Sequence, residues 1–238
     1  MNTCDDSVPA GELAASLCQT MADIHRRGWC DGTGGNFSCV SSREPLRLLM
    51  APSGVDKGQV QPGELIEVDA QAAVVAGGGK ASAETLLHLT IIEVTGAGAV
   101  LHTHSQAATL LSRDRGGHKS SRRPETTAEE TDAPAAPARH VQLEGLEMLK
   151  GLEGITSHRQ QIAIPVLAND QNLQRLSERA RPHLAEAPYG LLISGHGLYA
   201  WGRDLGSARR HLEILEFLLE QHWRHLLLTA TTAIGALS

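Results

Sequence analysis

The sequence predicts an α/β protein, and three observations support this fold class. Residues 11 to 27 have the spacing of apolar side chains that is typical of an amphipathic helix, at Leu13, Leu17, Met21 and Ile24. Short β-type runs follow, separated by clusters of Gly, Pro and Ser, and helix-like and strand-like segments then alternate to the end. A chain of 238 residues can bury a substantial core, and no shift in composition divides it, so we expect one domain over residues 1–238.

The first half of the chain contains three predicted helices and five predicted strands. Gly28 stops the first helix, and the runs "NFSCV", "LRLLMA", "LIEVD" and "AAVVA" are spaced as in an antiparallel meander. We expect a second helix over residues 83–95 with Ser82 as its N-cap. A strand that carries two histidines comes next, and another short helix starts near Ser105.

The second half begins with a polar segment over residues 113–139, which has almost nothing to bury and is predicted to be a disordered surface loop. A helix around residues 143–151, a strand "QIAIPVLA", a helix "QNLQRLSERAR" and a strand "GLLIS" follow. The last helix starts near Asp204, a candidate N-cap. Its apolar stripe is predicted to be core or a subunit contact and consists of Leu205, Ala208, Leu212, Leu215 and Leu219.

Composition excludes several classes of function. The formal net charge of -6 argues against nucleic acid or an anionic membrane as the main partner and favours a small-molecule ligand. The four cysteines lie in the first 39 residues without C-x-x-C spacing, which fits a reducing compartment. Asp5 and Asp6 stand where a signal peptide needs positive charge, and no apolar run is long enough to span a membrane. We therefore expect a cytoplasmic protein.

The stretch "AVLHTHSQA" places two histidines after an apolar run that is typical of a strand. Successive side chains of a strand point to opposite faces, so His102 and His104 share one face and Thr103 points to the other. Two imidazoles on one face can bind one metal ion. In a chain with 12 histidines this spacing also arises by chance, so the hypothesis needs further residues.

A third histidine lies in "LLISGHGLYAWG", where a strand breaks into Gly-His-Gly before another strand begins. The glycines permit a sharp turn that places His196 at a strand end. Taken alone, His196 is also compatible with a turn that faces solvent. Together with His102 and His104 it completes a three-histidine set of the kind that holds a catalytic Zn²⁺ with one open position. Three histidines suit Zn, Fe, Co and Ni alike.

Two Gly/Ser-rich turns are candidates for binding an anion. They are "GTGGNFS" at residues 32–38 and "APSGVDKG" at residues 51–58, each at the border of a predicted strand. Such turns offer backbone N–H groups and hydroxyls, and the helix start "SAET" at Ser82 adds the positive end of its dipole. Ordinary turns explain each loop equally well when it is considered alone.

The order of these motifs resembles the class II aldolase family of metal-dependent sugar-phosphate enzymes, from residue 11 to about 224. The resemblance implies a three-layer α/β/α fold with a large, mostly antiparallel central sheet. It also implies a ring-shaped homotetramer with active sites between subunits, and one Zn²⁺ per subunit bound by His102, His104 and His196.

The resemblance also implies roles for six further residues. Within the family, "LEMLKG" and "HGLYAWG" are most similar to a dehydratase branch, a hydro-lyase of methionine salvage whose substrate would be 5-methylthio-ribulose 1-phosphate. Glu147 matches the general acid/base of that branch, and Glu84 matches the catalytic carboxylate of the aldolases. The residues that match the family's phosphate site are Asn36, Ser53, Gly54 and Ser82.

Two other functions stay open at this point. An aldolase or epimerase uses the same metal and phosphate sites, and only the position of the acid/base separates it from a dehydratase. Adducin-like proteins use the same fold as an assembly module, which has no need of three histidines. Glu147 is also compatible with a solvated helix carboxylate beside Lys150.

Overall fold

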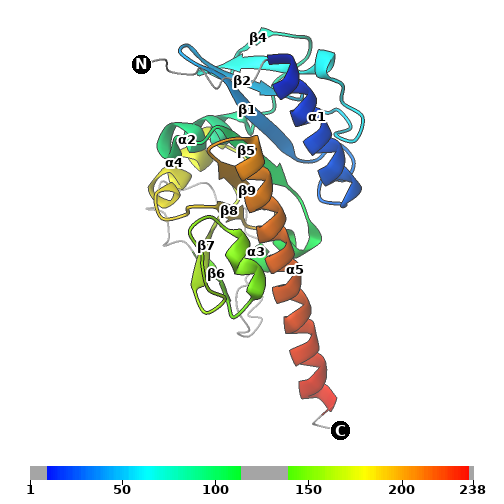
Figure 1. Cartoon of the computed structure of the whole chain (residues 1–238), viewed down its shortest axis with the longest axis vertical. Coiled ribbons are helices and arrows are strands. Elements are labelled where there is room, and N and C mark those ends of the chain that lie inside the picture. Colours follow the sequence, from blue (N-terminus) through cyan, green and yellow to red (C-terminus); the bar gives the residue numbers. More distant parts are fainter. Residues whose placement is uncertain (1–9, 114–138, 236–238) are drawn as a thin grey trace.

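A nine-stranded sheet runs through the part of the chain that the computed structural model describes, residues 10–113 and 139–235 (Figure 1). Its strand order is β4-β3-β2-β1-β5-β9-β8-β7-β6, and each neighbouring pair is antiparallel except β7 and β8. The strands are β1 (Asn36–Arg43), β2 (Leu46–Met50), β3 (Ile66–Asp69), β4 (Val74–Ala76), β5 (Ala99–Thr103), β6 (Arg139–Glu144), β7 (Gln161–Leu167), β8 (Gly190–Ile193) and β9 (Gly197–Gly202).

Helices cover both faces of this sheet (Figure 1). One face packs against α1 (Ala10–Arg26), α3 (Gln106–Arg113) and α5 (Leu205–Gly235), and the other against α2 (Thr85–Thr95) and α4 (Leu173–Leu184). Two 3-10 turns, η1 (Pro62–Glu64) and η2 (Glu147–Gly151), lie in connections. The prediction of a three-layer α/β/α fold with a mostly antiparallel sheet is thereby confirmed.

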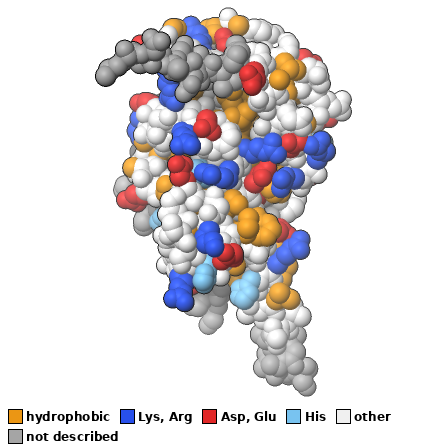
Figure 2. Space-filling view, viewed as in Figure 1, with side chains coloured by type: hydrophobic (Ala, Val, Ile, Leu, Met, Phe, Trp, Pro, Cys, Tyr) orange, Lys and Arg blue, Asp and Glu red, His pale blue; other side chains and the backbone are white. Residues whose placement is uncertain are grey.

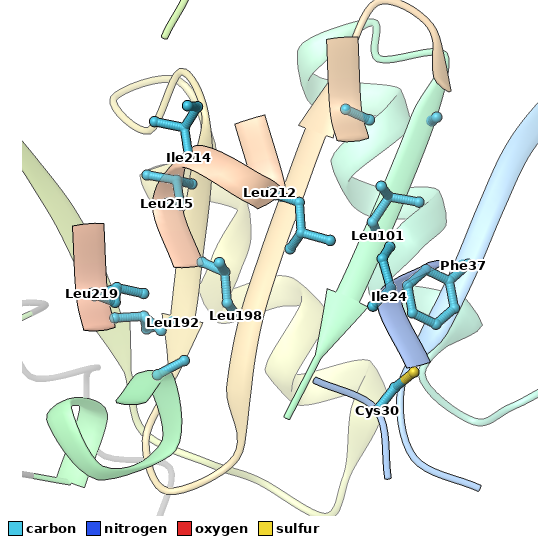
Figure 3. Close-up of a cluster of buried hydrophobic side chains, with 14 of the residues drawn as sticks. Ile24, Cys30, Phe37, Leu101, Leu192, Leu198, Leu212, Ile214, Leu215 and Leu219 are labelled. Carbon is cyan, nitrogen blue, oxygen red and sulfur yellow. The ribbon is translucent and has the colours of Figure 1, made fainter. Parts of the chain in front are cut away.

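The core under α1, α3 and α5 is built from alternate residues of the central strands. Figure 3 shows Leu212 and Leu215 of α5 over Leu198 of β9, and Ile24 of α1 beside Phe37 of β1. Each of these side chains is at most 1 % exposed. Full burial of one such side chain contributes about 1.5–3 kcal/mol, so the predicted stripe on the last helix is confirmed as core.

A second core lies between the sheet and the pair α2 and α4. Met50 of β2, Tyr199 of β9, Ile91 of α2 and Leu176 of α4 are fully buried there. Residues of α2 are buried on nearly all sides, which explains why its sequence "TLLHLTIIEVT" is apolar throughout rather than along one stripe.

Capping residues set the helix ends that position the site. Gly28 has φ 71° just beyond α1, and the side chain of Asp204 accepts a hydrogen bond of 2.6 Å from the N–H of Ser207 at the start of α5, as predicted. The prediction for α2 needs a correction. Glu84 is its N-cap, whereas Ser82 accepts a 3.3 Å hydrogen bond from the Glu84 N–H in the turn before the helix.

The prediction of a helix over residues 143–151 is wrong. Residues 139–144 form strand β6, in which Val141 and Leu143 are buried and their neighbours are not. Gly145 has φ 71°, which ends the strand, and only the single turn η2 follows. The predicted loop over residues 113–139 shares Arg113 with α3 and Arg139 with β6, and the rest of it lies outside the described residues.

The surface in Figure 2 carries basic and acidic side chains close together, without a large area of one sign. Within residues 10–113 and 139–235, no helix combines the length and the hydropathy that crossing a membrane requires. Among the described residues, Cys18, Cys30 and Cys39 are buried free thiols.

Candidate metal centre

Strand β5 directs consecutive side chains to opposite faces of the sheet at the point where the strand ends. His102 is directly opposite Asn36 of β1 and Tyr199 of β9, so these three side chains lie in one row on the face that α2 covers. Thr103 points to the other face, where its hydroxyl donates a hydrogen bond to Glu216 of α5. The alternation predicted for His102 and Thr103 is confirmed.

His104 lies one residue beyond β5 and is held by its backbone. Its N–H donates a 2.7 Å hydrogen bond to the carbonyl of Trp29, in the segment after α1. The imidazole lies against Gly34, where an added Cβ would be 3.0 Å from the His104 Nδ1 atom. The loop "GTGG" therefore leaves the space that the His104 ring fills.

His196 occupies the turn between β8 and β9. Gly195 has φ 65°, and a Cβ at Gly197 would lie 1.9 Å from the carbonyl oxygen of Thr103, so both glycines are required by the turn. The hydroxyl of Thr109 on α3 donates a 3.1 Å hydrogen bond to the His196 carbonyl. These contacts bring the turn against the end of β5.

Four side chains converge at this end of the sheet, which we call the ligand end. Glu84, His102, His104 and His196 each place one ligand atom within 4.8 Å of the others. The His102 Nε2 atom lies 2.8 Å from His104 Nε2 and 3.4 Å from His196 Nε2. The Oε1 atom of Glu84 lies 3.0 Å from His196 Nε2 and 3.7 Å from His102 Nε2.

The charge state of Glu84 follows from its neighbours. Burial favours the neutral acid, but the hydrogen bond with His196 and the electrostatic interaction with the neighbouring imidazoles outweigh it and lower the pKa of Glu84 to about 2. The side-chain amide of Asn36 also donates to this carboxylate. Glu84 is therefore ionised at neutral pH.

The imidazoles are suited to bind a cation. Burial lowers the pKa of His102 well below its usual value, and burial likewise lowers the pKa of His104, so both rings are neutral at pH 7. The Nδ1 atom of His102 donates a 2.9 Å hydrogen bond to the Leu198 carbonyl, which leaves the Nε2 lone pair free. Three imidazole nitrogens and one carboxylate form a donor set that fits a divalent metal.

The loops predicted to bind phosphate reach the same end of the sheet. Strand β2 runs toward this end, and the Ser53 N–H after it donates a 2.8 Å hydrogen bond to the Lys80 carbonyl, close to the start of α2. Gly54 is exposed with φ 80°, and Ser82 lies in the turn that leads to Glu84. The predicted anion-binding residues therefore lie at the ligand end, where Asn36 and Ser82 contact Glu84, and their role in binding an anion stays a prediction.

Within one chain, Glu147 does not lie near the four converging side chains at the ligand end. The strand pairings align Arg139, Val166, Leu192, Leu198 and Thr103 in one row at the ligand end. Strand β6 runs away from that row, so Glu147 in η2 lies beyond the opposite end, which we call the far end. Its carboxylate forms an ion pair with Lys150 and lies 3.8 Å from His158. The role predicted for Glu147 stays a prediction.

The structure also places buried polar residues that sequence reasoning missed. Lys57 is 2 % exposed and donates to the carbonyls of Thr33 and Val55, which ties the two Gly/Ser-rich loops together. Glu216 is 1 % exposed on the apolar face of α5. A charged residue four positions after Leu212 within such a stripe is the signal that could have identified it.

Comparisons with known proteins agree with this geometry. The model of the class II aldolase and adducin N-terminal domain matches residues 15–223. A methylthioribulose-1-phosphate dehydratase of Sodalis glossinidius is 40 % identical over 91 % of this chain and 98 % of its own. The enzyme of the same name from Pseudoalteromonas translucida is 38 % identical over 88 % of this chain and 90 % of its own.

Solved structures share the fold at lower sequence identity. A putative aldolase/epimerase/decarboxylase from Klebsiella pneumoniae has a TM-score of 0.72 and 20 % identity, and the alignment covers 91 % of each chain. The L-fuculose-1-phosphate aldolase of Thermus thermophilus has a TM-score of 0.68 and 24 % identity over 93 % of this chain and 98 % of that one. The chain belongs to the class II aldolase and adducin N-terminal domain family.

Proposed function

We propose that this chain is a zinc-dependent hydro-lyase that converts 5-methylthio-ribulose 1-phosphate to 5-methylthio-2,3-dioxopentyl phosphate, a reaction of methionine salvage. The observation that carries the proposal is the convergence of His102, His104, His196 and Glu84 at one sheet end. The relatives named methylthioribulose-1-phosphate dehydratase, which match nearly the whole chain, support this substrate over other sugar phosphates.

The metal is held, in this proposal, by the Nε2 atoms of His102, His104 and His196. Three imidazoles leave a coordination position for substrate oxygens, and a bound Zn²⁺ supplies Lewis acidity that stabilises negative charge on a carbonyl oxygen. The carbonyl of Leu198 fixes the tautomer of His102, and the Trp29 carbonyl fixes the backbone of His104. Both contacts keep the ligand atoms aimed at one point.

The phosphate of the substrate is bound, in this proposal, by the loops around that point. Asn36, Ser53, Gly54 and Ser82 offer side-chain or backbone donors, and the start of α2 adds a partial positive charge. The buried ammonium of Lys57 joins the two loops and contributes a full positive charge behind them. A ketose phosphate would then lie with its phosphate toward these loops and its carbonyl toward the histidines.

Dehydration needs a carboxylate that removes a proton from C3 and an acid that helps hydroxide leave from C4. Glu147 is our candidate, and its place at the far end means that it must come from a neighbouring subunit. A ring-shaped tetramer, which the family resemblance implies, supplies such an arrangement when the far end of one subunit meets the ligand end of the next. Glu147 is well exposed for this purpose, with 67 % of its side chain accessible.

Glu84 supports a second candidate function. Its carboxylate lies 3.0 Å from His196 Nε2, within the metal group itself, which is where an aldolase needs its base. Aldol cleavage would remove the proton of the C4 hydroxyl and break the C3–C4 bond. An adducin-like assembly role gains no support from the site, because such a role leaves four converging ligand side chains without a purpose.

A turnover assay distinguishes these functions. The purified protein is incubated with 5-methylthio-ribulose 1-phosphate, fuculose 1-phosphate and ribulose phosphate in separate reactions. We expect a dioxo product and water from the methylthio substrate and no aldehyde fragment from any of the three. An aldehyde fragment would identify an aldolase, and the absence of turnover from the zinc-loaded protein on all three would overturn the enzymatic proposal.

A further inference from the structure

We propose that Glu216, in the last helix, is a positioning residue that holds the His-x-His segment in the geometry for binding metal. The inference rests on the proposed metal site and extends it to the opposite face of the sheet. Glu216 touches neither the metal group nor the predicted substrate loops. It acts through the two residues on either side of His104.

Two hydroxyls connect Glu216 to that segment. Thr103 donates to its Oε1 atom, and Ser105 donates to its Oε2 atom at 2.5 Å. One carboxylate therefore binds the residue before His104 and the residue after it. Since Thr103 and His102 alternate across the strand, the same contact also fixes the strand that carries His102.

Burial makes this contact strong and its loss costly. Glu216 is 1 % exposed, Thr103 is fully buried and Ser105 is 4 % exposed, so water does not replace a missing partner. A carboxylate in such a place is unfavourable unless hydrogen bonds satisfy both oxygens, which the two hydroxyls do. An apolar residue at 216 would leave both hydroxyls without their acceptor.

The remaining contacts of the segment show why positioning matters there. Ser105 also accepts a 3.1 Å hydrogen bond from the Ala108 N–H, which starts α3, while the His104 N–H is bound by Trp29. His104 itself has no side-chain hydrogen bond outside the metal group among those that the structure gives. Its orientation toward the metal thus depends on the backbone, which Glu216 holds through both neighbours.

The test measures metal affinity rather than activity. Zn²⁺ affinity is obtained by competition with a chelator, and the absorbance of bound Co²⁺ reports the ligand geometry. Glu216→Gln replaces one of the two acceptor oxygens by a donor, and Thr103→Val removes one of the two hydroxyls. Contacts to residues outside the first ligand shell contribute about 10- to 100-fold to metal affinity, so we expect each variant to weaken Zn²⁺ binding by about 10-fold or more and to change the Co²⁺ spectrum.

Two controls separate positioning from general destabilisation. Thr103→Ser keeps the hydroxyl and is expected to keep wild-type affinity. His211→Gln alters a buried group on the same helix that binds the Trp201 carbonyl at 2.8 Å instead of the histidine segment, and it is expected to leave Zn²⁺ affinity unchanged. Circular dichroism confirms that each variant is folded, and Thr103→Val decides the question if Glu216→Gln does not fold.

The outcomes separate the inference from the proposed function. Wild-type Zn²⁺ affinity and an unchanged Co²⁺ spectrum in folded Thr103→Val would overturn the role of Glu216 while leaving the metal site intact. A wild-type protein that binds no Zn²⁺ would overturn both. Equal weakening in His211→Gln would show that the effect is general destabilisation and would also overturn the positioning role.

Discussion

The two ends of the central sheet differ in how complete they are within one chain. At the ligand end, Glu84, His102, His104 and His196 contact one another and are held by hydrogen bonds from both faces of the sheet. At the far end, Glu147 is exposed, and its carboxylate has ionic contacts with Lys150 and His158 among the described residues. The fold of one chain therefore brings the proposed metal-binding residues together. The proposed proton-transfer residue, in contrast, needs a neighbouring subunit to reach a metal group.

This difference explains which properties belong to one subunit. The ligands come from β5 and from the β8–β9 turn, which the sheet places side by side whether or not other subunits are present. Metal binding should therefore need only one folded chain. Catalysis by Glu147 should need an assembled ring. The predictions below test this division, beginning with the largest expected effect.

His104→Ala should remove metal binding and turnover together while the protein stays folded. The variant keeps two histidines and one carboxylate, which bind a divalent ion far more weakly, and the sheet has its own core without the ion. Metal content by elemental analysis and unfolding by circular dichroism measure the two effects. His140→Ala, at an exposed histidine of β6, is the matched control and should change neither. Full metal content in His104→Ala would contradict the ligand assignment.

Glu147→Gln should keep its metal and lower kcat by roughly 10²-fold or more, the usual scale of general acid–base catalysis. Its amide keeps the shape of the side chain but does not titrate. Glu84→Gln is the discriminating comparison. Normal turnover by Glu147→Gln together with an inactive Glu84→Gln would assign the acid/base to the ligand end and favour the aldolase mechanism.

Mixed tetramers test whether the two ends meet across subunits. Unfolding and refolding equal amounts of His104→Ala and Glu147→Gln allows an intact ligand end to meet an intact Glu147. If each site uses two neighbouring chains, about a quarter of the sites regain both groups, and turnover should rise to roughly that fraction of the wild-type value. A mixture that stays inactive would place both groups in the same chain.

Raising the pH from 5 to 8 should remove a contribution of Glu216 to the stability of the metal-free protein. Burial raises the pKa of Glu216 from 4.5 to about 7. A group with a raised pKa in the folded state stabilises the fold below its unfolded value, and this stability is lost as the pH rises through the folded pKa. The lowered pKa values of His102 and His104 act in the opposite direction, so the effect is measured by urea unfolding as the difference in unfolding free energy between the wild type and Glu216→Gln. This difference should change by about 3 kcal/mol over the pH range, whereas the difference between the wild type and Glu147→Gln should stay nearly constant.

The smallest expected effect concerns two buried thiols. Cys30 packs near Gly35 at the ligand end, whereas Cys39 lies opposite Ala99 at the start of β5. Burial raises the pKa of Cys30 to about 11 and that of Cys39 to about 12. In a Cys4→Ser background at pH 8, we expect iodoacetamide to label neither residue until the protein is unfolded, because the thiolate is the reactive form. Rapid labelling of Cys30 in the folded protein would show that the ligand end opens more readily than its packing indicates.

Sequence patterns predicted most of the residues at the ligand end, because the patterns that indicate them involve residues close together in the chain. His102 and His104 follow from strand alternation, and Gly195 and Gly197 indicate the turn that presents His196. Asn36 was predicted in a substrate loop, but its contact with Glu84 depends on the pairing of β1 with β5, which a local pattern does not contain.

The secondary structure was predicted wrongly where a short segment was assigned from the residues that follow it. In "RHVQLE" the buried Val141 and Leu143 alternate with exposed residues, which is a strand pattern, yet the following "EMLKG" suggested a helix. Glu216 was overlooked because one acidic residue in an apolar stripe contributes little to periodicity. Its partners lie more than 100 positions away in the chain, beyond the reach of spacing arguments.

The turn that carries His196 has a consequence for the biosynthesis of the protein. His102 and His196 are 94 positions apart, and Glu216 comes later still. A nascent chain that has emerged only through α4 contains two of the three imidazoles and lacks both β9 and α5, the elements that enclose β5. Metal capture is thereby deferred until the turn that carries His196 has been synthesised. A polypeptide that ends before His196 cannot form the three-histidine centre, so tight metal binding itself reports that synthesis has passed this turn.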